Sequence, residues 1–489
     1  MNMTQEKFAS EEGVKQDLQR QPSIMLKLAE NALQVAESLR GNYFSNTAKF
    51  IAALRGAMAR EENPIFKKRK VENADWSFFQ GETVAFVDGG IGQIEISSQV
   101  PVLLRVGSYI VKTGERNLAE REKFGYYPVI IGDLEGGSKE RPDFTDIIRI
   151  TAELLGGLSV LENNERLNVL MFHGPLVYTV HFYMGHTPFT EGDIDKLLSQ
   201  YGAKGTRGRE IKEAFLKQAF EEIYPKMTRN YVEWNEKRIF EPLSFMAYLL
   251  RLIITEAKKK NALVIGIVER ATKYSEFSKN YLLERVFQGL RKKNNIDFFN
   301  NMFGRKDLRD PETLLNKLGY TDSIFMSLLL EPEEYSEVWT MTKQYEFFSK
   351  RSVSLPNSSL VSEVDYSPLQ SGPFGFPKIL GSYLKVGDNI EPIRVETFAE
   401  LGDKQMEESV KRVYRYSKLL PQYGFPVGLD IADKFAHVPD WLTRAYSNLI
   451  KHHLGVSLQS GEINDAEMRR VLIQTIYMTH RDWLFRPKS

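Results

Sequence analysis

Two side chains that can bind a metal ion follow apolar runs in the first half of the chain. Asp88 comes after residues 83–87 and precedes Gly89–Gly90, and His173 ends the run 168–172. Such runs predict β-strands, and a polar side chain at a strand end reaches the rim of a sheet, where a ligand can approach. Asp-Gly is also a common turn signal, and a single histidine is commonly satisfied by local hydrogen bonds. If the two strands are neighbours, both side chains face one pocket.

Two further carboxylates lie in segments with helical periodicity. Glu153 shares a helical face with Asp146 and Arg149, opposite an apolar stripe between residues 147 and 158. A solvated Arg149–Glu153 pair stabilises a helix by only ~0.3–0.5 kcal/mol and needs no functional explanation. Asp433 is expected one turn into a helix that Asp430 caps, and capping alone accounts for both aspartates. The alternative is that Glu153 and Asp433 point at the same rim as Asp88.

The order of these residues along the chain favours a metal site over four unrelated explanations. A strand-end carboxylate, a helix glutamate, a strand-end imidazole and a late-helix carboxylate offer mainly oxygen ligands. Oxygen-rich sites favour magnesium or manganese, and two such ions can activate water and stabilise the leaving oxygen at a phosphodiester. The chain contains no cysteine, which excludes disulfides, thiolate zinc sites and cysteine nucleophiles.

The elements that must position these residues alternate between strands and helices. Short β-branched runs follow residue 83, a helix is expected from Phe144 with Gly156–Gly157 near its end, and a long apolar-faced helix passes through residues 243–257. The expected strands occupy residues 83–90, 93–97, 100–112, 168–172, 177–183, 262–268, 383–386 and 391–396. This order predicts an α/β fold, a mixed sheet flanked by helices and carrying a large helical insertion.

We expect four segments along the chain. An N-terminal helical segment covers residues 1–75, and its apolar stripe at Ile24, Leu28 and Leu39 is expected to dock on a neighbour. The core begins in residues 76–190 and is completed in 366–489. Residues 191–365 form a mostly helical insertion that contributes one core strand near 262–268.

Four short motifs resemble the NurA family of nucleases. They are FVDGG from Phe86, the Arg149-x-x-x-Glu153 helix, HGPL from His173 and FPVGLDIADKFAHV over residues 425–438. The family pattern has an Asp-Gly strand end, a helix glutamate preceded by arginine, a second Asp-Gly-(Ser/Pro)-Leu strand end and a late Tyr-Pro...Ala-(His/Asp) helix. The resemblance spans most of the chain and implies a ribonuclease-H-like fold. Nucleases with that fold use this order of metal ligands along the chain.

The resemblance implies a set of metal ligands and also two departures from the family. Asp88 and Glu153 carry over directly, and Asp433 stands where the family has histidine or aspartate. His173 stands where the family has aspartate, so either it binds the metal, manganese before magnesium, as a neutral nitrogen ligand or the site is weakened. Glu269 stands where a family lysine is expected, which removes a positive charge suited to DNA phosphate.

The function that the resemblance implies is metal-dependent hydrolysis of DNA. NurA proteins are dimers that act with a hexameric HerA-type ATPase in DNA end processing or antiphage defence. One alternative is an inactive NurA-like adaptor that caps and regulates the motor. The other is an unrelated α/β enzyme whose Asp-Gly turns only mimic the family.

Charge and hydropathy limit which kinds of partner the chain is expected to have. With 65 Lys+Arg against 64 Asp+Glu, basic regions must be judged locally. Arg149 and the run Lys67, Lys68, Arg69 and Lys70 are expected near DNA phosphates, as are the clusters at 258–260 and 291–293, although most such runs are solvated faces. No G-x-x-x-x-G-K-[ST] motif is present, so a motor would be a separate protein. Without a signal-like start or ~18 consecutive apolar residues, we expect a cytoplasmic protein with no membrane contact.

Overall fold

The computed structural model of the chain contains two units. The first comprises Met1–Ile65, Glu284–Lys317 and Asp465–Ser489, and the second Phe66–Leu283 and Leu318–Asn464. The structure describes residues 22–58, 66–72, 75–93, 102–131, 141–178, 189–199, 201, 205–269, 276–292, 300–301, 310–341, 364–370, 372–402, 404–420 and 422–476.

The elements described in the first unit are helical. They are α3 (Pro22–Ser38), η1 (Leu39–Phe44), α4 (Ser45–Met58), α12 (Glu284–Lys292), α14 (Pro311–Leu318), which ends at the unit's boundary, and α20 (Ala466–Ile476). The apolar stripe of α3 forms as its periodicity predicts. Residues 23–38 are all exposed, with Leu28 at 54% and Val35 at 58%, and the expected docking of this stripe stays a prediction.

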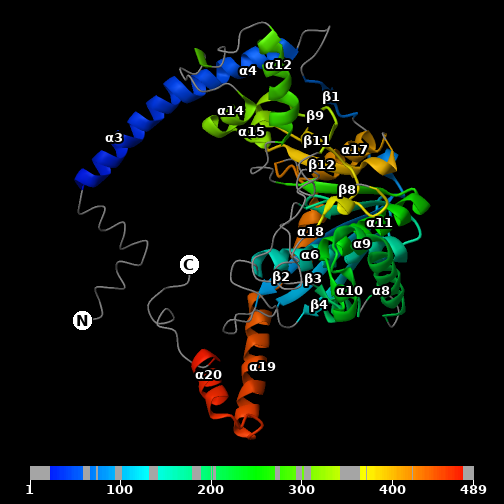
Figure 1. The fold of residues 1–489 in the computed structure, drawn as a ribbon. Coiled ribbons are helices and arrows are strands. Elements are labelled where there is room, and N and C mark those ends of the chain that lie inside the picture. Colours follow the sequence, from blue (N-terminus) through cyan, green and yellow to red (C-terminus); the bar gives the residue numbers. More distant parts are fainter. Residues whose placement is uncertain are drawn as a thin grey trace. The chain divides into compact units, whose positions relative to one another are not determined.

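The second unit is organised around one mixed sheet, which the described residues build from ten strands (Figure 1). The strands are β1 (Lys68–Lys70), β2 (Thr83–Gln93), β3 (Val102–Lys112), β4 (Glu122–Ile131), β5 (Leu167–His173), β8 (Leu263–Val268), β9 (Glu334–Ser336), β10 (Trp339–Thr340), β11 (Ile379–Lys385) and β12 (Ile393–Phe398). Their order is β1-β9-β11-β12-β8-β5-β2-β3-β4, with β10 beside β11. The central pairs β2/β5 and β5/β8 are parallel and the other pairs are antiparallel.

Helices flank this sheet, as the sequence predicts. They are α5 (Leu118–Arg121), α6 (Arg141–Asn163), α7 (Glu191–Leu198), α8 (Thr206–Gln218), η4 (Ala219–Ile223), α9 (Tyr224–Met227), α10 (Tyr231–Lys237), α11 (Pro242–Lys260), η5 (Phe277–Leu283), α15 (Asp322–Leu329), α17 (Gln405–Ser417), α18 (Val427–Ala436) and α19 (Asp440–Gln459). The remaining short elements are η2 (Trp76–Phe79), the pair β6 (Phe189–Thr190) and β7 (Ile239–Phe240), η6 (Ser367–Leu369) and η7 (Ala399–Leu401). The α/β fold is therefore confirmed.

Helices α6 and α18 cover opposite faces of β2. A Cβ added to Gly89 would lie 3.2 Å from Glu153 of α6, whereas one added to Gly90 would lie 2.1 Å from the carbonyl oxygen of Ala436 in α18. Successive residues of a strand point to opposite faces, so the two helices lie on the two sides. Helix α11 packs against α6, and α17 packs on β11 and β12. The core between the sheet and the helices α17 and α18 contains Phe86, Met171, Ile265, Val395, Val413 and Leu429.

The glycine pair Gly156–Gly157 acts through close packing inside α6 and not through a helix end. The expectation that Gly156–Gly157 lies near a helix end is wrong, because α6 continues to Asn163. A Cβ on Gly156 would lie 2.5 Å from Val106, and one on Gly157 would lie 2.2 Å from Phe172. Glycine is therefore needed there for α6 to lie directly on the sheet.

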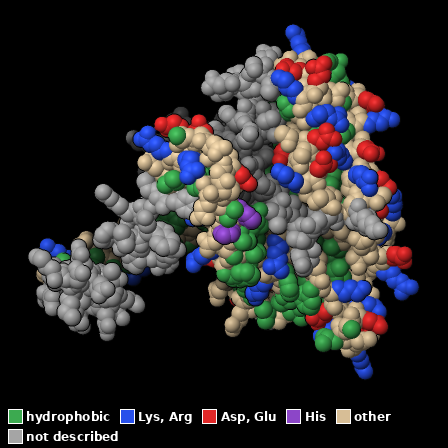
Figure 2. Space-filling model, turned by 90° about the horizontal axis from the view of Figure 1, so that it is seen from below, with side chains coloured by type: hydrophobic (Ala, Val, Ile, Leu, Met, Phe, Trp, Pro, Cys, Tyr) green, Lys and Arg blue, Asp and Glu red, His purple; other side chains and the backbone are tan. Residues whose placement is uncertain are grey.

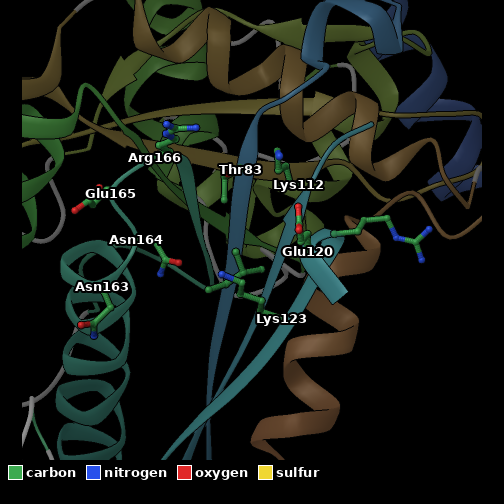
Figure 3. A pocket seen from close by; sticks show the side chains of 10 residues that line it. Thr83, Lys112, Glu120, Lys123, Asn163, Asn164, Glu165 and Arg166 are labelled. Atoms are coloured by element: carbon green, nitrogen blue, oxygen red, sulfur yellow. The ribbon is translucent and has the colours of Figure 1, made fainter. Parts of the chain in front are cut away.

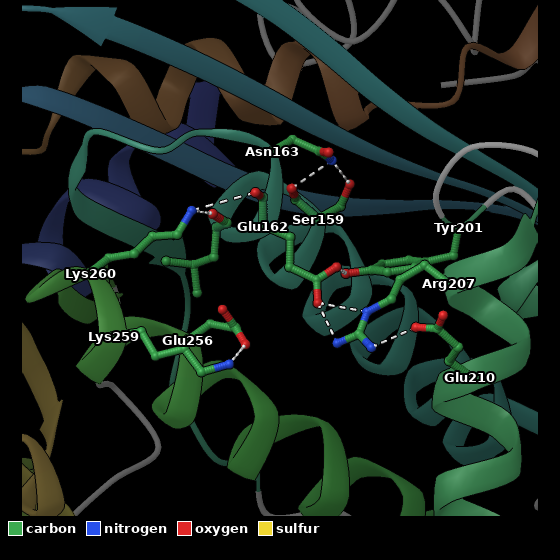
Figure 4. A network of polar contacts seen from close by, with 10 residues as sticks. Ser159, Glu162, Asn163, Tyr201, Arg207, Glu210, Glu256, Lys259 and Lys260 are labelled. Carbon is green, nitrogen blue, oxygen red and sulfur yellow. Dashed lines mark hydrogen bonds and ion pairs between the residues drawn. The ribbon is translucent and has the colours of Figure 1, made fainter.

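The helical insertion is tied to the end of α6 (Figure 4). The guanidinium of Arg207 in α8 donates to Glu162 at 2.7 and 3.0 Å, and Tyr201 donates to the same carboxylate at 3.1 Å. Lys260, the last residue of α11, donates to the carbonyl oxygens of Leu161, Glu162 and Asn164. Cations at a helix C-terminus satisfy its last carbonyl groups, so these contacts fix the helix that carries Glu153.

Hydrophobic side chains are exposed on the face drawn in Figure 2, among lysines and arginines and beside histidines. In helix α19 no residue is buried, and Trp441 is 68% exposed. None of the described helices combines the length and the apolar composition that crossing a bilayer requires.

Two expected strands, 93–97 beyond Gln93 and 177–183 beyond Tyr178, lie outside the described residues.

Candidate metal centre

Three of the four predicted ligands converge at one place. Asp88, His173 and Asp433 each offer a ligand atom, and these atoms lie within 4.8 Å of one another. Asp88 is 7% exposed, His173 is half-buried and Asp433 is exposed. The group therefore opens to solvent on its Asp433 side.

Asp88 lies in the middle of a strand and not at its end. Strand β2 runs from Thr83 to Gln93, so the interpretation of Asp88-Gly89 as a turn is wrong. The glycines are needed because α18 crosses directly over this part of the sheet. A Cβ on Gly90 or on Gly107, which pairs with Asp88, would meet a backbone oxygen of α18 at 2.1 or 2.5 Å. This close approach brings Asp433 to Asp88.

His173 is the last residue of β5, as predicted, and β5 is the parallel neighbour of β2. Its Nδ1 lies 2.9 Å from Oδ2 of Asp88, whose Oδ1 accepts a hydrogen bond from the backbone N–H of Gly89 at 2.7 Å. The ring also contacts Phe425, with centroids 5.3 Å apart. Gly174, with φ +122°, then turns the chain away from the strand, a conformation that favours glycine.

Asp433 reaches the site from α18, although not through the capping arrangement expected. The helix begins at Val427 with Pro426 as its N-cap, so Asp430 lies inside the helix and pairs with Lys434 at 2.6 Å. Helix capping therefore does not account for either aspartate. Asp433 lies one turn beyond Leu429, which packs in the core, and this spacing fixes the side of α18 from which it projects.

Glu153 lies beside the group but approaches from the other face of β2. It is 2% exposed, so the expectation of a solvated polar face is wrong. Its Oε2 would lie 3.2 Å from a Cβ on Gly89, and Arg149 Nη1 donates to it at 3.2 Å. Arg149 also lies over the ring of Tyr178, with its Cζ 5.4 Å from the centroid. Arg149 is thus an internal partner of Glu153, and its expected contact with DNA stays a prediction.

The electrostatics of the site reflect the convergence of carboxylates. Burial raises the pKa of Glu153, and Asp88 raises it further, although Arg149 opposes both. The pKa of Asp433 is raised by burial and by Asp88. Burial alone would lower the pKa of His173, but its hydrogen bond to Asp88 and the charges of Asp88, Glu153 and Asp433 raise it. Each shift favours bringing positive charge to the group, as a proton or as a cation.

The donor set fits a divalent cation. Two carboxylates and one imidazole within 4.8 Å match the ligand types of manganese. Asp433 supplies a second carboxylate beside Asp88, although His173 stands where the family has aspartate. A cation would relieve the repulsion between Asp88 and Asp433, and it requires a neutral His173. The roles of Asp88, His173, Asp433 and Glu153 as ligands stay predictions.

Two site residues were not found from the sequence as members of the site. Tyr178 donates from its hydroxyl to the carbonyl oxygen of His173 at 3.4 Å and packs over Gly174. The sequence predicted a strand over 177–183, but residues 175–178 lie outside any strand, so strand alternation did not indicate the direction of Tyr178. Phe425, which contacts His173, stands in the quoted C-terminal motif where the family pattern has tyrosine, and that difference was the available signal.

The basic run expected to contact DNA lies elsewhere on the sheet. Strand β1 holds Lys68, Arg69 and Lys70 at one end of the sheet, where all three and Lys67 are exposed and Lys68 pairs with Glu334 at 2.6 Å. In the cluster 258–260, Lys260 donates hydrogen bonds to backbone carbonyl oxygens at the end of α6. The contacts of these residues with DNA stay predictions.

A separate cavity of about 410 Å³ lies at the opposite end of β2, where Thr83 begins the strand (Figure 3). Its lining mixes cations and anions from the end of β3, from α5, from the start of β4 and from the segment between α6 and β5. Of the cations, Lys112 pairs with Glu115 at 2.9 Å and Arg121 with Glu122 at 2.6 Å. This cavity contains none of the predicted ligands.

Comparison with known proteins gives one family and several solved structures. The family described as NurA domain matches residues 82–438, which include all four predicted ligands. The NurA nuclease of Sulfolobus solfataricus is 12% identical, with a TM-score of 0.43, and the match covers 87% of this chain and 98% of that chain. A structure of NurA with manganese is 10% identical, with a TM-score of 0.36 and coverage of 84% and 97%. One of NurA bound to dAMP and manganese is 11% identical, with a TM-score of 0.30 and coverage of 86% and 92%.

No curated protein matches the chain. The family match extends over more than half of its residues, from the strand that carries Asp88 to the end of the segment that carries Asp433. The chain therefore belongs to the NurA domain family.

Proposed function

We propose that this protein is a metal-dependent deoxyribonuclease that hydrolyses phosphodiester bonds. The observation that carries the proposal is the convergence of Asp88, His173 and Asp433 within 4.8 Å in a chain of the NurA domain family. Solved NurA structures hold manganese and, in one case, dAMP, and we extend this metal and this class of ligand to the present chain.

The three converging residues would hold the cation, manganese or magnesium. When bound, the ion supplies positive charge that stabilises the charge developing on a phosphodiester as water attacks it. Asp88 is held for this role by the N–H of Gly89, which fixes one of its oxygens. Asp433 is exposed and therefore stands where a DNA strand can approach.

Glu153 would act from the far side of β2. Its carboxylate lies against Gly89, where no side chain separates it from the strand, and Arg149 keeps it in place. Burial and Asp88 raise the pKa of Glu153, so a cation bound at the group would favour loss of its proton, and the carboxylate would then add negative charge behind Asp88 and His173.

We further propose the cellular setting that the family implies. The protein would act on DNA in the cytoplasm as a homodimer with a HerA-type hexameric ATPase, in end processing or antiphage defence. The absence of a G-x-x-x-x-G-K-[ST] motif supports a separate motor, since the chain has no such phosphate-binding loop of its own.

A second candidate is an inactive adaptor that caps and regulates the motor. The contact of 2.9 Å between His173 and Asp88 favours it, because a protonated imidazole there places a positive charge where the cation would bind. The two candidates share the fold and differ in whether the site binds metal.

The test compares Asp88→Ala with wild type on linear double-stranded and single-stranded DNA. Each is assayed with manganese, magnesium or chelator, with and without a HerA-type ATPase. We expect manganese-dependent cleavage by the wild type, and its loss in Asp88→Ala. Asp430→Ala is the matched control, because Asp430 lies on α18 but pairs with Lys434 and should retain activity.

Two outcomes would contradict the nuclease. Cleavage that persists in Asp88→Ala would show that the activity arises elsewhere. No cleavage under any condition, together with a stable complex with the ATPase, would establish the adaptor.

A further inference from the structure

A buried ion pair lies behind the turn that follows His173. Arg394 and Glu396 on β12 are 1% and 0% exposed, and Arg394 Nε donates to Glu396 Oε1 at 2.8 Å. The second oxygen, Oε2, accepts a hydrogen bond from the backbone N–H of Leu176 at 2.8 Å. Both oxygens of one buried carboxylate are therefore engaged, one by its own strand and one by the turn.

The topology shows why this contact can reach across the sheet. Glu396 pairs with Gly266 on β8, and Gly266 pairs with Phe172 on β5. The turn after His173 folds back over Gly266, where a Cβ would lie 2.8 Å from Leu176 Cγ and 2.9 Å from the carbonyl oxygen of Gly174. Because Gly266 has no side chain, the turn can pass over β8 and meet Glu396.

Two further hydrogen bonds hold the start of the turn. The N–H of Gly174 donates to the carbonyl oxygen of Ile267 at 2.8 Å, and the hydroxyl of Tyr178 reaches the carbonyl oxygen of His173 at a longer 3.4 Å. Beyond Gly174, with its φ of +122°, the bond to Glu396 is the charge-assisted contact that fixes the backbone.

We propose that the Arg394–Glu396 pair positions His173 as a ligand by anchoring the turn at Leu176. Glu396 is a positioning residue, since it touches the turn and none of the three donors. This inference rests on the proposed metal site, because a fixed imidazole matters only if His173 binds an ion there. Groups behind a metal ligand typically change metal affinity by about 10–100-fold when they are replaced.

The chemistry of the pair makes a near-isosteric variant informative. Both partners of Glu396 are N–H donors, so in Glu396→Gln one of them faces an amide NH2 that cannot accept a hydrogen bond. The matched control is Glu241→Gln. Glu241 is also 0% exposed and binds a backbone N–H, that of Leu243 at 3.1 Å, but it lies in the helical insertion.

Two readouts that do not depend on cleavage test the proposal. Hydrogen exchange of the Leu176 amide should be about tenfold faster in Glu396→Gln, and manganese binding, measured by electron paramagnetic resonance, about tenfold weaker. Glu241→Gln should leave both unchanged. Unchanged Leu176 exchange in Glu396→Gln would overturn the proposal, as would altered exchange with unchanged manganese affinity.

A double variant keeps the test decisive if Glu396→Gln does not fold. Arg394→Met with Glu396→Leu removes both charges, and replacing a whole buried pair by apolar residues is often neutral for stability. We expect this variant to fold, to lose Leu176 protection and to bind manganese about tenfold more weakly. If it binds manganese as wild type does, the positioning role is refuted. If wild-type protein binds no manganese, the metal site itself fails, and the exchange data still report separately whether Glu396 anchors the turn.

Discussion

Two buried glutamates in the same unit show how a structural carboxylate differs from one at a candidate site. Glu241 is the N-cap of α11 and is 0% exposed, and its oxygens accept hydrogen bonds from Leu243 N and Tyr366 Oη, both at 3.1 Å. Glu153 is 2% exposed, but beside Arg149 it has Asp88 as a second charged neighbour. Donors surround the first carboxylate, whereas another carboxylate approaches the second.

The two carboxylates differ in whether the surrounding protein compensates their charge. The hydrogen bonds of Glu241 are complete within the protein, so its burial is explained by helix capping. At the metal group, the carboxylates of Glu153 and Asp433 each interact with that of Asp88. Arg149 and the titratable His173 oppose their negative charge. Like charges brought together in a folded chain without full compensation indicate a position that a cation can occupy.

The largest expected effect separates the two glutamates by activity. We expect Glu153→Gln to lower manganese-dependent DNA cleavage by roughly 1000-fold, because it removes negative charge from the metal group. Glu241→Gln should stay within about twofold of wild type, since Glu241 caps a helix in the insertion. Single-turnover cleavage of a labelled DNA measures both. Comparable losses in the two variants would show that burial, and not the site, explains the effect of Glu153.

The second expected effect is the pH dependence of stability at Glu241. Burial raises the pKa of Glu241 from 4.5 to about 7 in the folded chain, so folding favours the protonated carboxyl. Its contribution to stability is full below the unfolded pKa and is lost as pH rises through about 7. The loss amounts to about 3 kcal/mol, an order-of-magnitude value.

Calorimetry at pH 5 and pH 8 on wild type and Glu241→Gln tests this sign. Relative to the variant, wild type should become less stable at pH 8 than it is at pH 5. A difference between the two proteins that does not change with pH would contradict the prediction and would show that the hydrogen bonds from Leu243 and Tyr366 fully offset the burial of Glu241.

The sequence predicted the order of the elements better than the surroundings of the site. Apolar runs predicted β2, β5, β8 and β12, because a buried strand must be apolar whatever packs on it. His173 was placed correctly for the same reason, since the apolar run ends where it stands. These features depend on local composition.

What the sequence did not predict depends on contacts between distant residues. The interpretation of Asp88-Gly89 as a turn was wrong because Gly89 makes room for α6 and Gly90 for α18, and α18 follows more than 300 residues later. Glu153 appeared solvated because the ring that packs on its partner Arg149 belongs to Tyr178, which the sequence placed in an expected strand over 177–183. The bond from Leu176 to Glu396 spans 220 positions, and no local pattern relates the two.

The smallest expected effect is a gain in stability at the metal group. In the metal-free protein, Asp433→Asn should raise Tm by about 1 °C, because it removes the repulsion between Asp433 and Asp88. The gain is small because Asp433 is exposed and solvent screens its charge.

The same substitution should abolish most of the stabilisation that added manganese gives to wild type, because binding to the folded state raises Tm. Asp430→Asn on the same helix is the control, since it breaks the pair with Lys434 and should lower Tm slightly while the response to manganese stays intact. A fall in the metal-free Tm of Asp433→Asn would mean that favourable contacts hold Asp433 in the folded chain, as they hold Glu241. It would remove the distinction between a carboxylate that caps a helix and one that belongs to a cation site.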